Sequence, residues 1–288
     1  MQTGKILVTT DLTEISDIAA EYAADLAVQL NIKEVVLLNL LIPSHIQITA
    51  ASGGAYYLPY HVTHKLNDVL FNKRKDLVEK QAKKCSKPGV TIKPVVEVNH
   101  NTSDINHFMI EYQADLLVTG SRDKFSFMEI LLGSETEKMI RKIDYPMIVL
   151  TDEPISSTID SIVLAIDVEL EDKQQKGLES VTEFAGLLNA HLQLLYVITN
   201  GNISATAAIE RLHQLAKKKN MHNFSINTME NSSLESAIRN FSRKYKPDMI
   251  ALLTQGKGKL HNLIYGSDTA GVISETDLPV FVARSVLG

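Results

Sequence analysis

The chain has 288 residues, which is more than one small domain needs and enough to fill two hydrophobic cores. Apolar residues make up 44% and charged residues 22%, and the formal net charge is −5, so no basic face for nucleic acid or anionic membrane is indicated. The single cysteine, Cys85, excludes an internal disulfide and favours a reducing, cytoplasmic location.

The chain begins with MQTGKILVTTD, which leads almost directly into an apolar run. This start lacks the basic region and long apolar core of a signal peptide, and no run reaches the roughly 18 apolar residues of a membrane span. A first strand is expected at 5–10, closed by Asp11, and an amphipathic helix with an alanine-rich face is expected at 15–30.

The rest of the first half continues to alternate strands and helices. We expect strands near 34–41, 91–98, 115–119 and 146–151, and helices near 65–86, 103–113 and 134–143. Residues 43–64 show no clear period, and a loop of that length inside a compact domain is functional or mobile. The stretch SGGAYY within it is interpreted as flexible loop.

The second half repeats the order of the first. KILVTTD, which ends at Asp11, is matched by SIVLAID, which ends at Asp167, and ADLLVTGSRDKFSFMEILLGSETEKMI is matched by PDMIALLTQGKGKLHNLIYGSDTAGVI. Asp11 and Asp167 are 156 residues apart, whereas Gly133 and Gly266 are 133 apart, so the first half carries 23 extra residues before its glycine-containing loop. Second-half strands are expected near 161–166, 192–198, 223–228, 248–253 and 279–284.

This alternation predicts an α/β fold of two tandem doubly wound domains, 1–152 and 153–288, with helices on both faces of each parallel sheet. Ligands of such sheets bind at the carboxyl ends of the strands, where the strand order reverses. If the first and fourth strands of each half are neighbours, Asp11 and Gly120 line one crevice, and Asp167 and Gly256 line the other.

The two copies resemble the universal stress protein family in its tandem form, and the resemblance covers essentially the whole chain. The family's loop pattern is glycine, two residues, glycine, nine residues, glycine, and then serine or threonine. The resemblance implies five-stranded parallel sheets of order 3-2-1-4-5, with the two halves paired through their fifth strands. It also implies a stress-linked regulatory role, with ATP and Mg²⁺ as ligands in many members and not in others. Whether tandem chains form a further homodimer stays open.

The resemblance also implies roles for individual residues. Asp11 and Asp167 match the aspartate that faces the adenosine part of the nucleotide, and Leu40 and Val197 match the apolar contact to the base. The implied nucleotide-binding positions of the two halves are, in chain order, Asp11, Leu40, Gly120, Gly133, Ser134, Asp167, Val197, Gly256, Gly266 and Ser267.

Each copy departs from the loop pattern at one glycine. Asp123 replaces the middle glycine of the first half, and Leu253 replaces the first glycine of the second. A carboxylate within roughly 5 Å of a triphosphate costs on the order of a few kcal/mol unless a cation bridges them. Arg122 and Lys124 offset that charge if they point inward, whereas the side chain of Leu253 is expected to crowd the second crevice.

Several residues have structural interpretations beside the functional ones. Asp11 and Asp167 are also suited to be helix caps or turn residues. Cys85 is interpreted as an incidental exposed thiol whose lysine neighbours lower its pKa. His61 and His64 have usable spacing for a metal on a helix, although histidines on loops are usually polar surface.

No acid, base or nucleophile constellation indicates an enzyme, so at most a very slow ATPase is expected. The sequence therefore favours a stress-response regulatory protein that binds adenine nucleotide weakly or in one half only. The alternative is a protein-interaction module that works without nucleotide and keeps two degenerate nucleotide sites.

Overall fold

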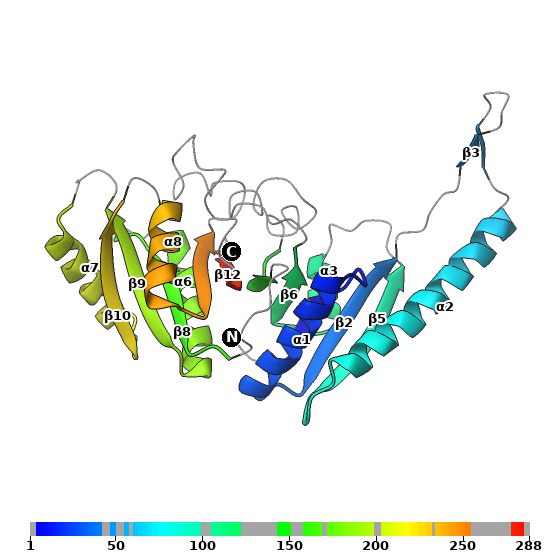
Figure 1. Cartoon of the computed structure of the whole chain (residues 1–288), viewed down its shortest axis with the longest axis horizontal. Helices are drawn as coiled ribbons and strands as arrows, with labels where there is room; N and C mark the ends of the chain where they lie inside the picture. The colour runs from blue at the N-terminus through cyan, green and yellow to red at the C-terminus, as the bar shows by residue number, and fades with distance from the viewer. Residues whose placement is uncertain are drawn as a thin grey trace.

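The structure is a computed structural model, and the ranges that it describes are residues 4–41, 47–49, 55–57, 60–98, 105–121, 143–150, 158–168, 172–198, 203–231, 234–254 and 278–284. Ten strands form one continuous sheet, and helices cover its faces (Figure 1). The expected helix at 134–143 lies outside the described residues.

The first half of the sheet has the order β5-β2-β1-β6-β7, and its neighbouring strands are parallel. Its strands are β1 (Ile6–Thr9), β2 (Glu34–Leu41), β5 (Thr91–Val98), β6 (Leu116–Gly120) and β7 (Met147–Leu150). Its described helices are α1 (Glu14–Gln29), α2 (Tyr60–Lys84) and α3 (Ile105–Glu111).

The second half has the order β10-β9-β8-β11-β12, again with parallel neighbours. Its strands are β8 (Ser161–Ala165), β9 (His191–Ile198), β10 (Phe224–Glu230), β11 (Met249–Thr254) and β12 (Val280–Arg284). Its described helices are α6 (Asp172–Leu188), α7 (Ala205–Lys218) and α8 (Leu234–Tyr245). In both halves the chain order of the strands reads 3-2-1-4-5, so the predicted α/β fold class is confirmed.

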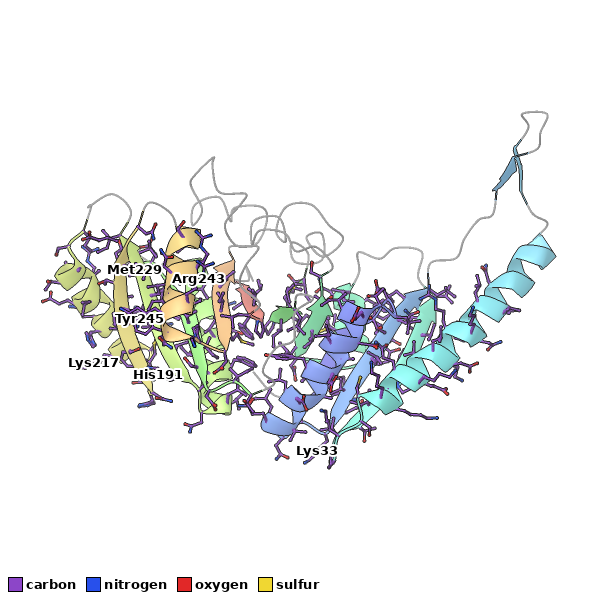
Figure 2. All side chains as sticks on the ribbon, in the orientation of Figure 1. Lys33, His191, Lys217, Met229, Arg243 and Tyr245 are labelled. Carbon is purple, nitrogen blue, oxygen red and sulfur yellow. The ribbon has the colours of Figure 1, made fainter. Side chains whose placement is uncertain are left out.

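The apolar strand runs are buried because helices cover both faces of the sheet. Residues of α1, α2, α6 and α7 pack against one face in one hydrophobic cluster, and residues of α3 and α8 pack against the other. Figure 2 shows the side chains filling the space between sheet and helices in both halves.

The two halves meet at their fifth strands. β7 pairs antiparallel with β12 through Met147, Ile148 and Val149, and this is the antiparallel join in the ten-stranded sheet. The side chain of Gln29 in α1 adds two hydrogen bonds across the join, donating to the carbonyl of Ile159 at 3.0 Å and accepting from its N–H at 3.1 Å. The two halves are therefore held together by the backbone pairing of β7 with β12 and by the side-chain hydrogen bonds of Gln29.

Equivalent helix ends in the two halves share an uncommon backbone conformation. Asn31 and Asn189 follow α1 and α6 with φ of 56° and 54°, and Gln113 and Lys246 follow α3 and α8 with φ of 54° and 46°. A residue in the left-handed region is a frequent way to end a helix, and Asn tolerates it better than most residues. The two halves therefore end equivalent helices in the same backbone conformation.

An aspartate before the fourth strand also has the same partners in both halves. The carboxylate of Asp115 accepts from the N–H of Gly4 at 2.7 Å, just before β1. The carboxylate of Asp248 accepts from the N–H groups of Asp160 and Ser161 at 3.0 and 2.9 Å, at the start of β8. Each aspartate ties the entry of the first strand to the entry of the fourth.

The segment expected to be a structureless loop differs from its prediction. Residues of the SGGAYY stretch form part of a small antiparallel hairpin, β3 (Gln47–Thr49) with β4 (Ala55–Tyr57), and α2 begins at Tyr60, inside the expected loop. In Figure 1 the first turns of α2 run past the edge of the sheet and carry this hairpin away from it. The extra length of the first half is therefore an arm built on an extended helix.

Candidate functional site

In each half the strand order reverses at the first strand, where the sequence predicts a ligand crevice. β1 lies between β2 and β6, and β8 lies between β9 and β11. Asp11 and Gly120 therefore stand at the carboxyl ends of neighbouring strands in the first half. Asp167 and Leu253 stand at the corresponding ends in the second half. This is the place where doubly wound sheets bind their ligands.

Asp11 is exposed, and its carboxylate holds the turn before α1. It accepts from the N–H of Thr13 at 3.1 Å and from the Thr13 hydroxyl. Leu12 between them has a φ of 68°, in the left-handed region. Such a turn satisfies N–H groups at the start of a helix, which is the structural role considered for this residue. The guanidinium of Arg74 in α2 donates to the Asp11 carbonyl at 3.5 Å, so a side chain of α2 reaches the carboxyl end of β1.

Behind Asp11 the first half has a buried polar network. The Thr10 hydroxyl lies 2.8 Å from Oε1 of Gln81 and 3.0 Å from the Ser16 hydroxyl, and Asn39 donates to the Thr10 carbonyl at 2.7 Å. Gln81 in turn donates to the Asp17 carboxylate at 2.7 Å. Buried polar groups that hydrogen-bond to one another fix the positions of their elements. The network locks α1, α2 and β2 around the end of β1.

Gly120 is required by packing at the end of β6. A Cβ atom there would lie 2.7 Å from Cγ1 of Ile15 and 2.8 Å from the Ile15 carbonyl oxygen. The first turn of α1 can approach β6 closely only because this position has no side chain. Gly120 therefore fixes how closely α1 packs on the end of β6, whether or not a ligand is bound.

The second crevice is lined differently. Ile166 occupies the position of Thr10 and is 4% exposed, so an apolar side chain replaces the centre of the polar network. Leu253 occupies the position of Gly120 and is 2% exposed within the hydrophobic core. The Leu253 side chain packs into the core, and because the loop after it lies outside the described residues, the crowding of the crevice stays a prediction.

The remaining carried-over residues are only partly described. Leu40 and Val197 are partly buried and pack against the cluster on the α3 and α8 face of the sheet. Asp167 is exposed. The loop positions that lie outside the described residues are Asp123, Gly133, Ser134, Gly256, Gly266 and Ser267.

No group of three His, Cys, Asp or Glu side chains suited to a metal occurs among the described residues. The side chains of His61 and His64 lie outside that part of the structure. His107 makes a local contact with Glu111, one helical turn away, at 3.4 Å.

Cys85 differs from its prediction. It is 2% exposed rather than a surface thiol. Burial, together with the nearby Asp17 and Glu21 carboxylates, raises its pKa to about 11, and the lysines beside it in the sequence only partly oppose this shift. The thiol is therefore protonated at neutral pH and packs as a small apolar group.

Two contributors to the first crevice were not predicted from the sequence. Arg74 and Gln81 lie on α2, more than 60 residues from Asp11, in a stretch with many other polar side chains. Nothing in their sequence surroundings distinguishes them. The aspartates at 115 and 248, by contrast, stand at equivalent positions of the repeat, and aligning the halves would have found them.

No helix in the described ranges combines the length and apolar character that crossing a membrane requires. The sequence model of the universal stress protein family matches residues 2–151. A universal stress protein of Methanocaldococcus jannaschii is 26% identical over 151 residues, which cover 50% of this chain and 93% of that protein.

Solved structures share the fold over nearly the whole chain. A universal stress protein from Archaeoglobus fulgidus matches with a TM-score of 0.66 at 18% identity, over 98% of this chain and 97% of its own. A protein of unknown function from Pseudomonas aeruginosa matches with a TM-score of 0.56 at 16% identity, over 98% and 93%. Since the family model covers more than half of its residues, this chain belongs to the universal stress protein family.

Proposed function

We propose that the chain consists of two tandem universal stress protein domains, 1–152 and 153–288, and acts as a stress-response regulatory protein that binds Mg-ATP in its first domain. The observation that carries the proposal is that β1 and β6 are parallel neighbours at the reversal of strand order, so that Asp11 and Gly120 stand at adjacent carboxyl ends. The family model matches this half, at residues 2–151.

The contrast between the halves supports assigning the ligand to the first. Its strand ends have an exposed carboxylate at Asp11, the guanidinium of Arg74 on the Asp11 carbonyl and a polar network behind them. The equivalent interior of the second half is apolar at Ile166 and Leu253. A nucleotide needs hydrogen-bonding partners in fixed positions. Of the two predicted crevices, only the first has a buried polar network among its described residues.

The test begins with the purified protein. It is denatured, and any released small molecule is identified by mass spectrometry; the emptied protein is then titrated with Mg-ATP by calorimetry. Asp11→Asn keeps an oxygen for the Thr13 turn but removes the charge, and should weaken ATP binding roughly tenfold, the loss typical of a hydrogen bond to a charged group. Asp167→Asn is the matched control in the second half and should leave the affinity unchanged.

Gly133→Arg should abolish binding if the first loop holds phosphate. A protein that is empty as purified, and gives no heat or thermal stabilisation with millimolar Mg-ATP, would contradict the proposal. The alternative would then hold, in which the protein acts on protein partners without nucleotide. This alternative predicts that the set of proteins captured with the chain changes neither on addition of ATP nor in the Gly133→Arg variant.

The use of the Asp11 carboxylate by the Thr13 turn favours this second candidate. A carboxylate that already accepts two hydrogen bonds has less capacity left for a ligand. The Asp11→Asn titration separates the two, because a residue that only holds a turn would leave the ATP affinity unaltered.

A further inference from the structure

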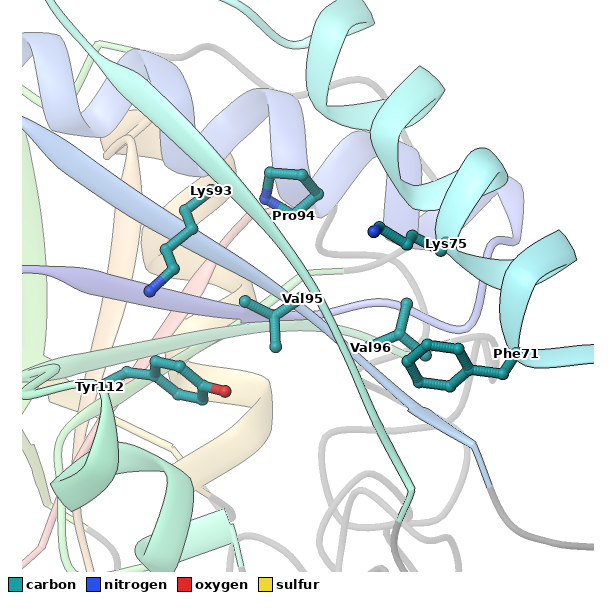
Figure 3. A pocket seen from close by; sticks show the side chains of 7 residues that line it. All are labelled: Phe71, Lys75, Lys93, Pro94, Val95, Val96 and Tyr112. Atoms are coloured by element: carbon teal, nitrogen blue, oxygen red, sulfur yellow. The ribbon is translucent and has the colours of Figure 1, made fainter. Parts of the chain in front are cut away.

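A pocket of about 310 Å³ lies at the outer edge of the sheet, on β5 and away from the β1–β6 crevice. It is lined by Phe71, Lys75, Lys93, Pro94, Val95, Val96 and Tyr112. Figure 3 shows that these side chains come from three places: α2, β5 and the residue that follows α3. The volume is at the lower end of the range that small-molecule sites occupy.

The pocket wraps around the edge of the strand. Val96 packs with the core on the α2 face, whereas Val95 and Tyr112 pack with the core on the α3 face. Phe71 and Lys75 reach the strand from α2, and the Lys93 side chain extends toward the Tyr112 ring (Figure 3). An apolar surface thus has one cation on each side of the strand.

The charges at the pocket favour an anion. The Lys93 ammonium lies 5.2 Å from the centre of the Tyr112 ring and has no carboxylate partner in the described part of the chain. Lys75 makes no ion pair with any described residue. The carboxylate at this edge, Glu97, accepts from the Tyr112 hydroxyl at 2.6 Å, and burial and this bond raise the Tyr112 pKa, so the hydroxyl stays a donor to Glu97.

Pro94 argues against a peptide strand as the ligand. The N–H of Thr91 donates to Lys33 before β2, so alternate residues of β5 face β2 and Pro94 belongs to the outward-facing set. Proline has no N–H to donate, and proline in a strand is typical of an edge that does not accept another strand. The edge is therefore suited to contact through side chains.

The second half has no lysine on the equivalent edge strand, and its cation over the tyrosine ring is Lys244 of α8 instead. By strand register, Ser225 stands at the position of Lys93, Asn227 at that of Val95 and Met229 at that of Glu97. The tyrosine is kept as Tyr245, which packs against Phe241 with ring centres 4.4 Å apart. Figure 2 shows Met229 and Tyr245 at this outer end of the second half, where no lysine stands on β10.

We propose that this pocket is a second ligand site, which takes a small aromatic carboxylate with its ring against Phe71, Pro94 and Val96 and its carboxylate at the edge of the strand, facing both Lys93 and Lys75. The aromatic body follows from the apolar lining, the charge follows from the two lysines, and the size follows from the volume. The site is separate from the proposed nucleotide crevice and does not depend on it.

The probe is phenylacetate, and its binding to the full chain is measured by NMR chemical-shift changes. Neutral phenylacetamide is the matched control ligand. We expect saturable shifts at Val95, Val96 and Tyr112 with phenylacetate, and clearly weaker binding of phenylacetamide. Lys93→Met and Lys75→Met should each weaken phenylacetate binding roughly fivefold, the upper range for an exposed ion pair. Lys80→Met, on the exposed side of the same helix, should change nothing.

Lys93→Arg, which keeps the charge, should retain binding, and melting curves of all variants report whether they fold. Three outcomes would overturn the proposal. The first is no saturable shift with phenylacetate. The second is equal binding of the amide with no effect of the lysine substitutions, which would indicate an apolar patch only. The third is displacement of phenylacetate by Mg-ATP from the wild type but not from Gly133→Arg, which would place the probe in the nucleotide crevice.

Discussion

Gly120 ends β6 at a point where the first turn of α1 passes within contact distance of the strand. The sequence presented it as the first glycine of a phosphate loop, whereas its surroundings give it a packing role that does not need phosphate. Both roles rest on the absence of Cβ, so the glycine alone does not distinguish them. The equivalent Leu253 is accommodated in the core of the second half.

Gly120→Ala should therefore lower the free energy of unfolding by roughly 1–3 kcal/mol, the usual cost of inserting an atom into a packed site. The new methyl would meet the Ile15 side chain and carbonyl at less than 3 Å. Gly186→Ala is the control, because nothing lies within 4 Å of its Cβ position in α6 and the change should stabilise the helix. Urea unfolding of both variants measures the difference, and an unchanged Gly120→Ala midpoint would show that α1 moves freely.

Cys85 gives a prediction that depends on pH. Its pKa rises from 9.0 to about 11 on folding, mainly through burial. The folded protein then holds the thiol proton more tightly than the unfolded chain, so stability from this group is complete below pH 9 and is lost as the pH rises toward 11. Cys85→Ala should show a smaller loss of stability than the wild type between those values. Parallel curves for the two proteins would mean that the thiol is not shielded from water.

At the scale of whole elements, apolar runs such as 34–41 and 192–198 predicted strands well. A buried parallel strand leaves a clear local signal, and β2 and β9 lie within one residue of those ranges. The arm at 47–57 left no such signal, since three-residue strands are too short to show alternation. The beginning of α2 was also missed, because residues 60–64 show no clear helical period of their own.

The candidate site was predictable only where it is local in sequence. Asp11 and Gly120 were found because each closes a strand. The partnership of Thr10 with Gln81 was not found, because the two residues are 71 positions apart and depend on how α2 lies against β1. Long-range pairs of this kind follow from topology and helix orientation, which polar residue types do not encode by themselves.

The connection of α2 to the end of β1 can be tested through Gln81. Its buried amide accepts from Thr10 and donates to Asp17, so Gln81→Leu leaves both without this partner. We expect a loss of roughly 1–3 kcal/mol in the free energy of unfolding. Lys84→Met is the control, because the exposed pair of Lys84 with Asp17 at 2.7 Å should matter little. A neutral Gln81→Leu would show that packing alone seats α2.

At the scale of the whole molecule, the two halves share one sheet rather than touching as separate bodies. β7 and β12 each have one parallel neighbour within their half and one antiparallel neighbour across the join. Phe184 and Phe281 stack at 4.5 Å beside it. Since every residue of β7 is buried, the join removes an apolar edge that each half alone would leave open.

The fragment 1–152 should therefore form a dimer through antiparallel pairing of β7 with β7 of a second fragment. In that dimer the second β7 takes the place that β12 has in the whole chain. Sedimentation at micromolar concentration measures the mass, and circular dichroism checks that the fragment is folded. Ile148→Lys puts a charge at the middle of the pairing register and should give a folded monomer, whereas Lys33→Met, an exposed site at the start of β2 remote from the join, should leave the dimer intact. A folded wild-type fragment that stays monomeric would mean that β7 is covered by other parts of its own half, and that the join contributes less to the molecule than its burial indicates.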